Sequence, residues 1–358
     1  MVRSLPTDAV QLFYRDEMPS SLRVVHAVRS NGFAGVERSI LLSSKVLVER
    51  GHQVTIVGGD SYAMTDQLAG TGIAWLPSAT TFEVARSLLR LGRRDIVHAH
   101  MTAAEIGAVV TRPRHRAALV TTRHFAAERG LSRTGLVAAR VIDRVRHEEI
   151  AISQYVSDRI GVPSTIVTHG LENREPVELR EPRVVLIQRL EPEKHTDVAL
   201  RAWAVSGLGS NGWKLDIAGD GAARTDLERL AVTLGVSDSV TFLGRVADVD
   251  GLRRVAAVQL ATPPTEHFGL SVLEAMACGL PVVAADGGAH RELLGDSGVY
   301  FPPGDAIAAA GALRSLASDL RRRSDLGSRL VARQRALFSL ASHGERLEAV
   351  YLTALASR

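Results

Sequence analysis

The chain has 358 residues, 46% of them hydrophobic and 23% charged, which is typical of globular proteins and long enough for two domains. Its single cysteine, Cys278, excludes an internal disulfide and a zinc site built from several cysteines. The net charge of +4 is small for this length; it favours anionic ligands such as nucleotides, phosphosugars or lipid head groups, and we expect no nucleic-acid partner. No apolar run approaches the roughly 18 residues of a membrane-spanning helix, and the first twenty residues lack the apolar stretch of a secretory signal. We therefore expect a cytoplasmic enzyme.

Residues 1–21 are expected to form a loose leader. A strand at 22–28, a small-residue turn at 30–35, a helix at 36–50 and a strand at 54–57 then follow from the hydrophobic pattern. Gly51 stands where helices commonly end in glycine. This order indicates the βαβ unit of a parallel sheet. The alternation continues with helices at 82–91, from 102 and at 134–147, and with strands at 95–100, 118–122, 150–152 and 165–167.

A charged segment with two prolines, residues 172–183, interrupts this pattern and indicates a domain boundary. A second series follows, with strands at 184–187, 215–218, 240–243, 258–261 and 281–284 and helices at 196–206, 223–234, 248–256, 270–277 and from 306 onward. We predict an α/β protein with two Rossmann-like domains facing a central cleft. The expected parts are a leader (1–21), a first domain (22–175), a second domain (176–335) and a C-terminal helix (336–358) that packs back on the first domain. Ligands of such folds bind beyond the carboxyl ends of the strands.

The most informative stretch follows the strand that ends at Ala261. A proline-stiffened loop presents Glu266, Gly269 permits close approach of the backbone to a ligand, and a helix then begins with free N–H groups that suit an anion. Glu274 lies about one turn into that helix. Two carboxylates beside an anion site fit a ligand that also offers sugar or ribose hydroxyls. The alternative is that both acids only complement the helix dipole.

Three other turns hold candidate ligand contacts. Arg189 and Lys194, after the first strand of the second half, could clamp a diphosphate, or they could form local ion pairs in a charged loop. Gly35 lies in a small-residue turn that could approach a phosphate or simply be tight. His124 follows a strand of the first half and could bond a substrate hydroxyl, although a lone histidine is usually structural.

Glu266 and Glu274 stand in a Glu-x7-Glu pattern within a stretch that runs to Ala284 and resembles the signature of the family 4 retaining glycosyltransferases, which have the GT-B fold. Weaker matches to this family extend over most of the chain: Ala34-Gly35-Val36-Glu37, Arg50-Gly51-His52-Gln53-Val54, residues 95–100, the loop from Arg189 to Lys194 and Gly219-Asp220-Gly221.

The resemblance implies roles for residues around the Glu-x7-Glu pattern. Glu274 would bind the ribose hydroxyls of a donor nucleotide, and Glu266 would contact hydroxyls of the donor sugar. Phe268, Gly269 and Leu270 would offer backbone N–H groups to the diphosphate or the adjacent sugar.

The resemblance also implies roles elsewhere in the chain. Arg189 and Lys194 would neutralise the diphosphate leaving group, and the residues around Gly244 and Arg245 would frame the base. In the first domain, which usually holds the acceptor, Gly35 would lie close to the phosphates. His124 would lie near C1 and C6 of the donor sugar.

This chain departs from the family pattern at three positions where the family usually has glycine. Ala34 replaces the first glycine of its turn, and a positive φ there would be costly. Gln188 and His195 replace the glycines that usually flank the loop from Arg189 to Lys194.

Other patterns are weaker pointers to a site. Asp248-Val249-Asp250 spells a metal motif of another glycosyltransferase fold, but it is better interpreted as a helix N-cap. His98 and His100 share a strand face, and two ligands do not make a zinc site. Gly219-Asp220-Gly221 lacks the third small residue of a dinucleotide motif.

Two basic stretches are candidates for holding an anionic or lipid-linked acceptor, or for peripheral contact with an anionic membrane. The first is residues 112–116, and the second comprises Arg129, Arg133, Arg140, Arg144 and Arg146. The alternative is a solvated arginine face.

The sequence thus predicts a metal-independent retaining hexosyltransferase. It would move a sugar from a nucleoside diphosphate donor, UDP- or GDP-linked, to a hydroxyl acceptor; the donor is a substrate, and no cofactor is expected. The alternatives are a nucleotide-sugar epimerase on the same fold and a non-catalytic nucleotide-sugar-binding protein.

Overall fold

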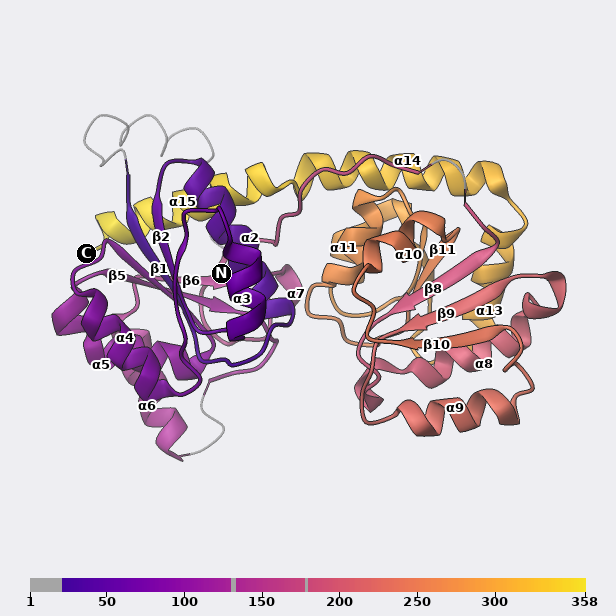
Figure 1. Cartoon of the computed structure of the whole chain (residues 1–358), viewed down its shortest axis with the longest axis horizontal. Coiled ribbons are helices and arrows are strands. Elements are labelled where there is room, and N and C mark those ends of the chain that lie inside the picture. Colours follow the sequence, from indigo (N-terminus) through magenta and orange to yellow (C-terminus); the bar gives the residue numbers. More distant parts are fainter. Residues whose placement is uncertain (1–20, 130–132, 178–179) are drawn as a thin grey trace. The chain divides into compact units, whose positions relative to one another are not determined.

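The computed structural model describes residues 21–129, 133–177 and 180–358, with the backbone alone for 133–138. The expected leader therefore lies outside the described residues, except for Ser21. The chain divides into two compact units (Figure 1). The first comprises residues 1–170 and 340–358, and the second comprises 171–339, so the units change at 170/171 and 339/340, a few residues from the boundaries predicted at 175/176 and 335/336.

The first unit is a seven-stranded parallel sheet in the order β3-β2-β1-β4-β5-β6-β7. Its strands are β1 (Arg23–Val28), β2 (Gln53–Val57), β3 (Ala74–Leu76), β4 (Ile96–His100), β5 (Ala118–Arg123), β6 (Glu148–Ala151) and β7 (Thr165–Ile166). Its helices are α2 (Gly35–Glu49), α3 (Ser61–Leu68), α4 (Thr81–Leu91), α5 (Thr102–His115), α6 (Arg133–Val145), α7 (Gln154–Ser157) and α15 (Leu340–Ala356).

Helices cover both faces of this sheet because alternate strand residues point to opposite sides. Val24 and Ile96 belong to the cluster that includes α2 and α15 side chains, whereas Val25 and Val97 belong to the cluster of α4 and α5. Both faces of the sheet are therefore buried, and some strands bury polar side chains as well, such as His98 of β4, Thr121 of β5 and Glu149 of β6.

The second unit is a six-stranded parallel sheet in the order β10-β9-β8-β11-β12-β13. Its strands are β8 (Arg183–Ile187), β9 (Lys214–Ala218), β10 (Val240–Gly244), β11 (Val258–Ala261), β12 (Val282–Ala285) and β13 (Val299–Phe301). Its helices are η1 (Pro192–Lys194), α8 (Thr196–Ser206), η2 (Gly209–Asn211), α9 (Arg224–Thr233), α10 (Val249–Val255), α11 (Leu270–Ala277), α12 (His290–Leu294), η3 (Gly295–Ser297), α13 (Ala306–Ala317) and α14 (Leu320–Leu337).

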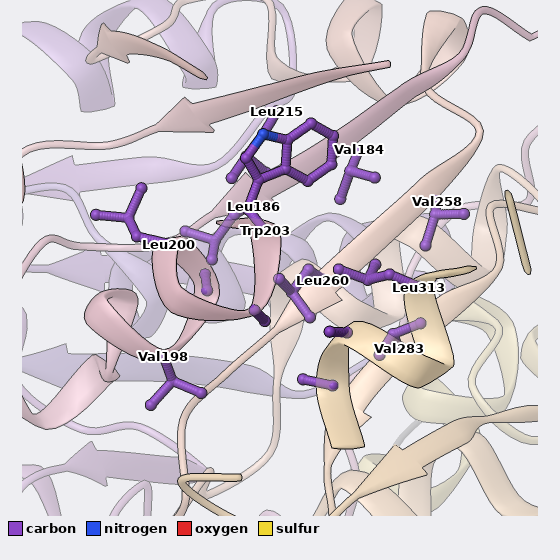
Figure 2. Close-up of a cluster of buried hydrophobic side chains, with 14 of the residues drawn as sticks. Val184, Leu186, Val198, Leu200, Trp203, Leu215, Val258, Leu260, Val283 and Leu313 are labelled. Atoms are coloured by element: carbon purple, nitrogen blue, oxygen red, sulfur yellow. The ribbon is translucent and has the colours of Figure 1, made fainter. Parts of the chain in front are cut away.

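The core of this unit surrounds Trp203 of α8 (Figure 2). The indole is fully buried among aliphatic side chains such as Leu186 and Leu215, and its N–H donates to the hydroxyl of Ser239 at 3.0 Å. A buried indole thus keeps a hydrogen-bond partner and contributes apolar area without an orphaned donor.

Each sheet reverses its strand order at one point, between β1 and β4 in the first unit and between β8 and β11 in the second. Loops that leave adjacent strands at such a point diverge to opposite faces, which opens a crevice at the carboxyl edge. The predicted site residues of the second unit lie after β8, at the end of β10 and after β11.

The Arg50-Gly51-His52 motif fastens α15 to the first sheet. His52 accepts the Leu22 N–H at its Nδ1 and contacts Glu348 of α15 through Nε2 at 2.9 Å, and the Arg50 Nε donates to the same carboxylate at 3.1 Å. These hydrogen bonds and the charge of Arg50 outweigh partial burial and lower the pKa of Glu348 to about 2. The motif therefore has a structural role in this chain.

Replacing Glu348 by alanine should lower the free energy of unfolding by about 1–2 kcal/mol, because two donors lose a charged acceptor. Urea unfolding at pH 7 measures the effect. Glu345→Ala, at an exposed position of the same helix, is the matched control and should change stability by less than about 0.5 kcal/mol. Equal effects of the two substitutions would contradict this role.

Candidate functional site

The predicted site residues fall in both units. Gly35 and His124 belong to the first unit, and the second unit holds Arg189, Lys194, Gly244, Arg245, Glu266, Phe268, Gly269, Leu270 and Glu274.

Lys194 and Glu266 meet across the strand-order reversal of the second sheet. Lys194 ends η1 after β8, Glu266 lies in the loop after β11, and the lysine Nζ is 2.9 Å from the glutamate Oε2. Burial alone would raise the pKa of Glu266, but the charge and hydrogen bond of Lys194 outweigh it and lower that pKa. The carboxylate is therefore ionised at neutral pH, and both side chains remain partly exposed.

Gln188 and His195 hold the loop that carries Lys194. The Gln188 amide donates to the Lys194 carbonyl and to the Thr196 hydroxyl, both at 2.9 Å, and the Thr262 hydroxyl donates to that carbonyl at 2.8 Å. His195 has φ of +50°, in the left-handed region that favours glycine. The family's glycine at this position thus has a conformational reason, and Gln188 ties the loop to the end of β11.

The N-terminus of α11 lies directly after the Glu266 loop. Gly269, with φ of +101°, precedes the first turn, and no side chain caps the helix. Backbone contacts hold the loop: the Ala289 N–H donates to the Glu266 carbonyl at 2.7 Å, and Gly288 has φ of +60° where a Cβ would collide with Glu266. Phe268 is buried and packs edge-on against Phe338. This geometry fixes Glu266 beside uncapped helix N–H groups.

Gly219 and Gly244 support the Arg189 loop by close backbone approach. A Cβ on Gly219 would lie 1.8 Å from the Gln188 carbonyl oxygen, and the Gly219 N–H donates to the Gly244 carbonyl at 2.7 Å. The Gly-x-Gly turn therefore packs three loops together at the carboxyl edge of the sheet. Arg189 itself is exposed by 63% and pairs with Glu193 at 3.1 Å, so the local ion pair considered from the sequence is present. Arg245 is exposed.

Glu274 is buried and pairs with Arg253, a residue that the sequence analysis did not identify. Arg253 is only 1% exposed, and its guanidinium also contacts Asp250 at 3.1 Å and the Ser271 hydroxyl at 3.3 Å. Gln259 of β11 donates to the Ser271 carbonyl at 3.0 Å. Arg253 and Arg254 are adjacent in sequence, and only the tertiary structure decides which of them is buried.

The aspartates that precede Arg253 behave as predicted from their spacing. Asp248 caps α10 by accepting the Gly251 N–H at 2.8 Å. Asp250 pairs with Arg174 and Arg253. The N-cap predicted from the sequence is therefore confirmed for Asp248.

Gly35 in the first unit begins α2 and is exposed. Ala34 has an extended conformation, with φ of −134°, so the strain considered for a positive φ does not arise. Glu37 accepts the Ala34 N–H at 2.9 Å and thereby closes the turn. A cavity of about 510 Å³ lies nearby in the same unit; its polar lining includes Ser30, Asn31, Asp60, Arg86 and Arg90.

His124 follows β5 and joins a group of buried histidines. It is 5% exposed, and its Nε2 is 2.9 Å from the Nδ1 of His100. The sequence paired His98 with His100, and the structure adds His26, which lies opposite His98 in the β1–β4 register. Ring nitrogens of these three histidines lie within 4.8 Å of one another, a spacing that a metal ion could use.

The expectation of a free basic surface is wrong for Arg129. This guanidinium is only 4% exposed and bonds the buried carboxylates of Glu105 and Glu149 at 2.7–2.8 Å. Arg146 also pairs with Glu149, at 3.0 Å. These arginines compensate buried acids of their own unit, whereas Arg140 and Arg144 are exposed and the side chain of Arg133 lies outside the described residues. Within the described part of the chain, no helix combines the length and apolar character required to cross a membrane.

Comparisons with known proteins match the second unit to a family model and the chain to relatives and solved structures. A family model described as glycosyl transferases group 1 matches residues 171–330, beginning at the first residue of the second unit. The second unit therefore contains a glycosyl transferases group 1 domain. The chain is 27% identical to an alpha-D-kanosaminyltransferase of Streptomyces kanamyceticus over 63% of its own length and 62% of that protein.

A second relative and a solved structure extend the comparison. The chain is 35% identical to a GDP-mannose-dependent alpha-(1-6)-phosphatidylinositol dimannoside mannosyltransferase of Mycobacterium tuberculosis, over 39% of this chain and 41% of that protein. It spans less than two thirds of the length of either relative. The crystal structure of Anabaena HepE with UDP-glucose superimposes with a TM-score of 0.79 at 21% identity, over 92% of this chain and 99% of HepE. This confirms the predicted fold class, two Rossmann-like α/β domains of the GT-B type.

Replacing Arg253 by leucine should lower the free energy of unfolding by about 3–5 kcal/mol, because the buried Glu274 carboxylate loses its cation. Urea unfolding at pH 7 measures this. Arg254→Leu, at the exposed neighbouring position, is the matched control and should have an effect below about 0.5 kcal/mol. A small effect of Arg253→Leu would show that Glu274 does not depend on this partner.

The buried histidines should make the first unit acid-sensitive. Burial lowers the pKa of His26 to about 3, and of His124 and His343 to about 4, well below 6.5. Below about pH 6.5 these histidines bind protons in the unfolded chain but stay neutral in the folded unit. Their contribution to the free energy of unfolding is therefore fully present above about pH 6.5 and is lost as the pH decreases toward 4. At pH 5.5 the loss should be about 1 kcal/mol for each such histidine.

Urea unfolding between pH 7.5 and 5.5 measures this dependence. His343→Asn removes one titrating group and should make the slope shallower. Stability that is unchanged over this pH range would contradict the neutral state of the cluster.

Proposed function

We propose that this chain is a glycosyltransferase that moves a sugar from a UDP- or GDP-linked donor to a hydroxyl acceptor, with retention of configuration at C1 and without a metal ion. The observation that carries the proposal is the Lys194–Glu266 pair beside the uncapped N-terminus of α11, at the strand-order reversal of the glycosyl transferases group 1 domain. HepE was crystallised with UDP-glucose and the M. tuberculosis relative is GDP-mannose-dependent, which supports these two donor classes.

The donor would lie along the carboxyl edge of the second sheet. Lys194 and the N–H groups of Phe268, Gly269 and Leu270 would bind the diphosphate, since a helix N-terminus and a cation both stabilise negative charge. Glu266 would accept hydrogen bonds from the sugar hydroxyls.

The nucleoside would lie beside the same elements. Glu274, fixed by Arg253, would bind the ribose diol, because one carboxylate can accept two hydroxyl bonds. Arg189 is exposed and could turn from Glu193 to the diphosphate at small cost, because a surface ion pair contributes at most about 1 kcal/mol. Gly244 and Arg245 would border the base.

The first unit would bring the acceptor and His124 to the reacting carbon. Gly35 would lie near the phosphates, and the cavity lined by Asn31, Arg86 and Arg90 is a polar candidate for an anionic acceptor. A lipid-linked acceptor or peripheral membrane contact remains a prediction for Arg140 and Arg144.

The chemistry follows from where charge develops. Breaking the bond between C1 and the phosphate oxygen leaves positive charge on the sugar ring and negative charge on the diphosphate. Lys194 and the α11 N–H groups would stabilise that leaving group. The acceptor oxygen would bond to C1 on the face that the phosphate leaves, and the departing phosphate would take the acceptor proton. This step needs neither a protein base nor a metal ion.

Donor binding should raise the Tm of the intact chain with at least one of UDP, GDP, ADP and dTDP, since a ligand of the folded state stabilises it by mass action. Glu274→Gln should weaken binding by about tenfold or more, because a charged acceptor becomes a neutral amide. Asp226→Asn, at an exposed acid of the same unit, is the control and should leave the shift unchanged. No shift with any nucleotide would contradict the proposed function.

The product should keep the anomeric configuration of the donor, and the transfer rate should change less than about twofold when EDTA replaces Mg²⁺, because Lys194 and helix N–H groups supply the charge stabilisation. NMR of the purified product and rates with UDP-glucose or GDP-mannose as donor provide the two measurements. An inverted product would overturn retention, and loss of activity in EDTA that Mg²⁺ restores would overturn metal independence.

A further inference from the structure

A continuous hydrogen-bonded chain runs from Tyr351 of α15 to His124, entirely within the first unit. The Tyr351 hydroxyl is 3.4 Å from the Nε2 of His26, whose Nδ1 is 3.0 Å from the Nε2 of His100. The Nδ1 of His100 is 2.9 Å from the Nε2 of His124. A branch leaves the same hydroxyl toward His98, at 2.8 Å.

The sheet register places these groups in one line. His26 and His98 are register partners in β1 and β4, and His100 lies two residues beyond His98 on the same face. His124 follows β5, the next strand, in which Thr122 is the register partner of His100. Tyr351 reaches this face from α15, which packs against α2 and β5.

All members of the chain are buried, and burial keeps the histidines neutral by lowering the pKa of His26, His100 and His124. A neutral imidazole carries one N–H and one bare nitrogen. Each ring that donates at one nitrogen must therefore accept at the other. The proton position on one ring consequently fixes the proton position on the next ring along the whole chain.

Only two arrangements of the protons satisfy the chain. If Tyr351 donates to His26, each ring donates its N–H to the next ring toward His124. His124 then accepts at Nε2 and carries its proton on Nδ1. If Tyr351 donates to His98, the Tyr351 oxygen accepts from His26, the chain reverses, and His124 carries its proton on Nε2. The Tyr351 hydroxyl lies closer to His98, at 2.8 Å, than to His26, at 3.4 Å. His98 can in turn donate its Nε2–H to the Thr122 hydroxyl at 2.6 Å. These distances favour the second arrangement.

We propose that Tyr351, His26 and His100 are positioning residues that hold His124 in the Nε2–H tautomer and present its Nδ1 as a hydrogen-bond acceptor. This inference rests on the proposed function, in which His124 lies near the donor sugar: a bare Nδ1 would accept a bond from a sugar hydroxyl, and a protonated Nδ1 would not. A hydroxyl ligand that donates to His124 is therefore the chemistry that this chain selects.

Nitrogen-15 NMR of the histidine side chains in the full-length protein tests the inference without any ligand. The wild-type chain should show His124 with an unprotonated Nδ1 and a protonated Nε2. Tyr351→Phe removes the acceptor of the His26 Nε2–H, and a buried donor without a partner is costly. The His26 proton should then move to Nδ1, the chain should reverse, and the His124 Nδ1 resonance should shift to that of a protonated nitrogen.

His343→Asn is the matched control, because His343 is buried on the same helix but bonds Ser43 and Thr168 outside the chain. It should leave the His124 tautomer unchanged. A protonated Nδ1 in the wild type, an unchanged His124 in Tyr351→Phe, or the same shift in His343→Asn would each overturn the inference. Because the wild-type spectrum alone can refute it, the test does not require the variants to fold.

Two further outcomes are distinguishable. One equivalent of tightly bound zinc whose removal by a chelator shifts the ring nitrogens of His26, His98 and His100 would overturn the hydrogen-bonded chain in favour of a metal site. If the protein shows the predicted tautomer but never turns over UDP-glucose or GDP-mannose, the inference about the hydrogen-bonded chain stands and the proposed function is contradicted.

Discussion

The ion pair between Lys194 and Glu266 is the contact around which the proposed site is organised. It joins the two loops that leave β8 and β11, the strands between which the second sheet reverses its order. A parallel sheet gathers its carboxyl-end loops at one edge, and this pair fixes two of them at 2.9 Å beside the uncapped N-terminus of α11. In the proposed function, this pair would hold a cation for the diphosphate and a carboxylate for the sugar hydroxyls together before a ligand arrives, which is the preorganisation that electrostatic catalysis requires.

Several residues of the adjoining loops hold these two loops in place. Gly219 and Gly288 allow backbones to approach where a Cβ would collide, and His195 adopts a left-handed conformation. Gln188 donates to the Thr262 hydroxyl at 3.2 Å and so links the loop after β8 to the loop after β11. Arg253 supplies a buried cation for Glu274. Lys194, Glu266, Arg253 and Glu274 therefore each have a partner of opposite charge.

The strands and longer helices follow from the sequence because their local patterns agree with their tertiary environment. The predicted helices at 196–206 and 270–277 coincide with α8 and α11. The prediction omitted the three-residue strands β3 and β13, because strands this short have too few residues for a periodic pattern. It also omitted α3, which buries only Met64 and Leu68 and therefore shows little apolar periodicity.

Prediction from local sequence patterns has the same limit for the site residues. The Glu-x7-Glu pattern indicates Glu266 and Glu274, but no local signal distinguishes the buried Arg253 from the exposed Arg254. Period-two geometry pairs His98 with His100, whereas His26 joins them only because β1 lies beside β4 in the folded sheet. Arg129 was expected on the surface, yet two buried glutamates from distant segments surround it. Contacts between segments far apart in sequence are set by strand order, which the pattern of any one segment does not contain.

A crystal structure of the chain with bound UDP or GDP tests the central claim most directly. The account predicts diphosphate oxygens within hydrogen-bond distance of the Lys194 Nζ and the N–H groups at the start of α11, with the ribose hydroxyls on Glu274. A nucleotide bound elsewhere, with Lys194 still paired only to Glu266, would contradict it.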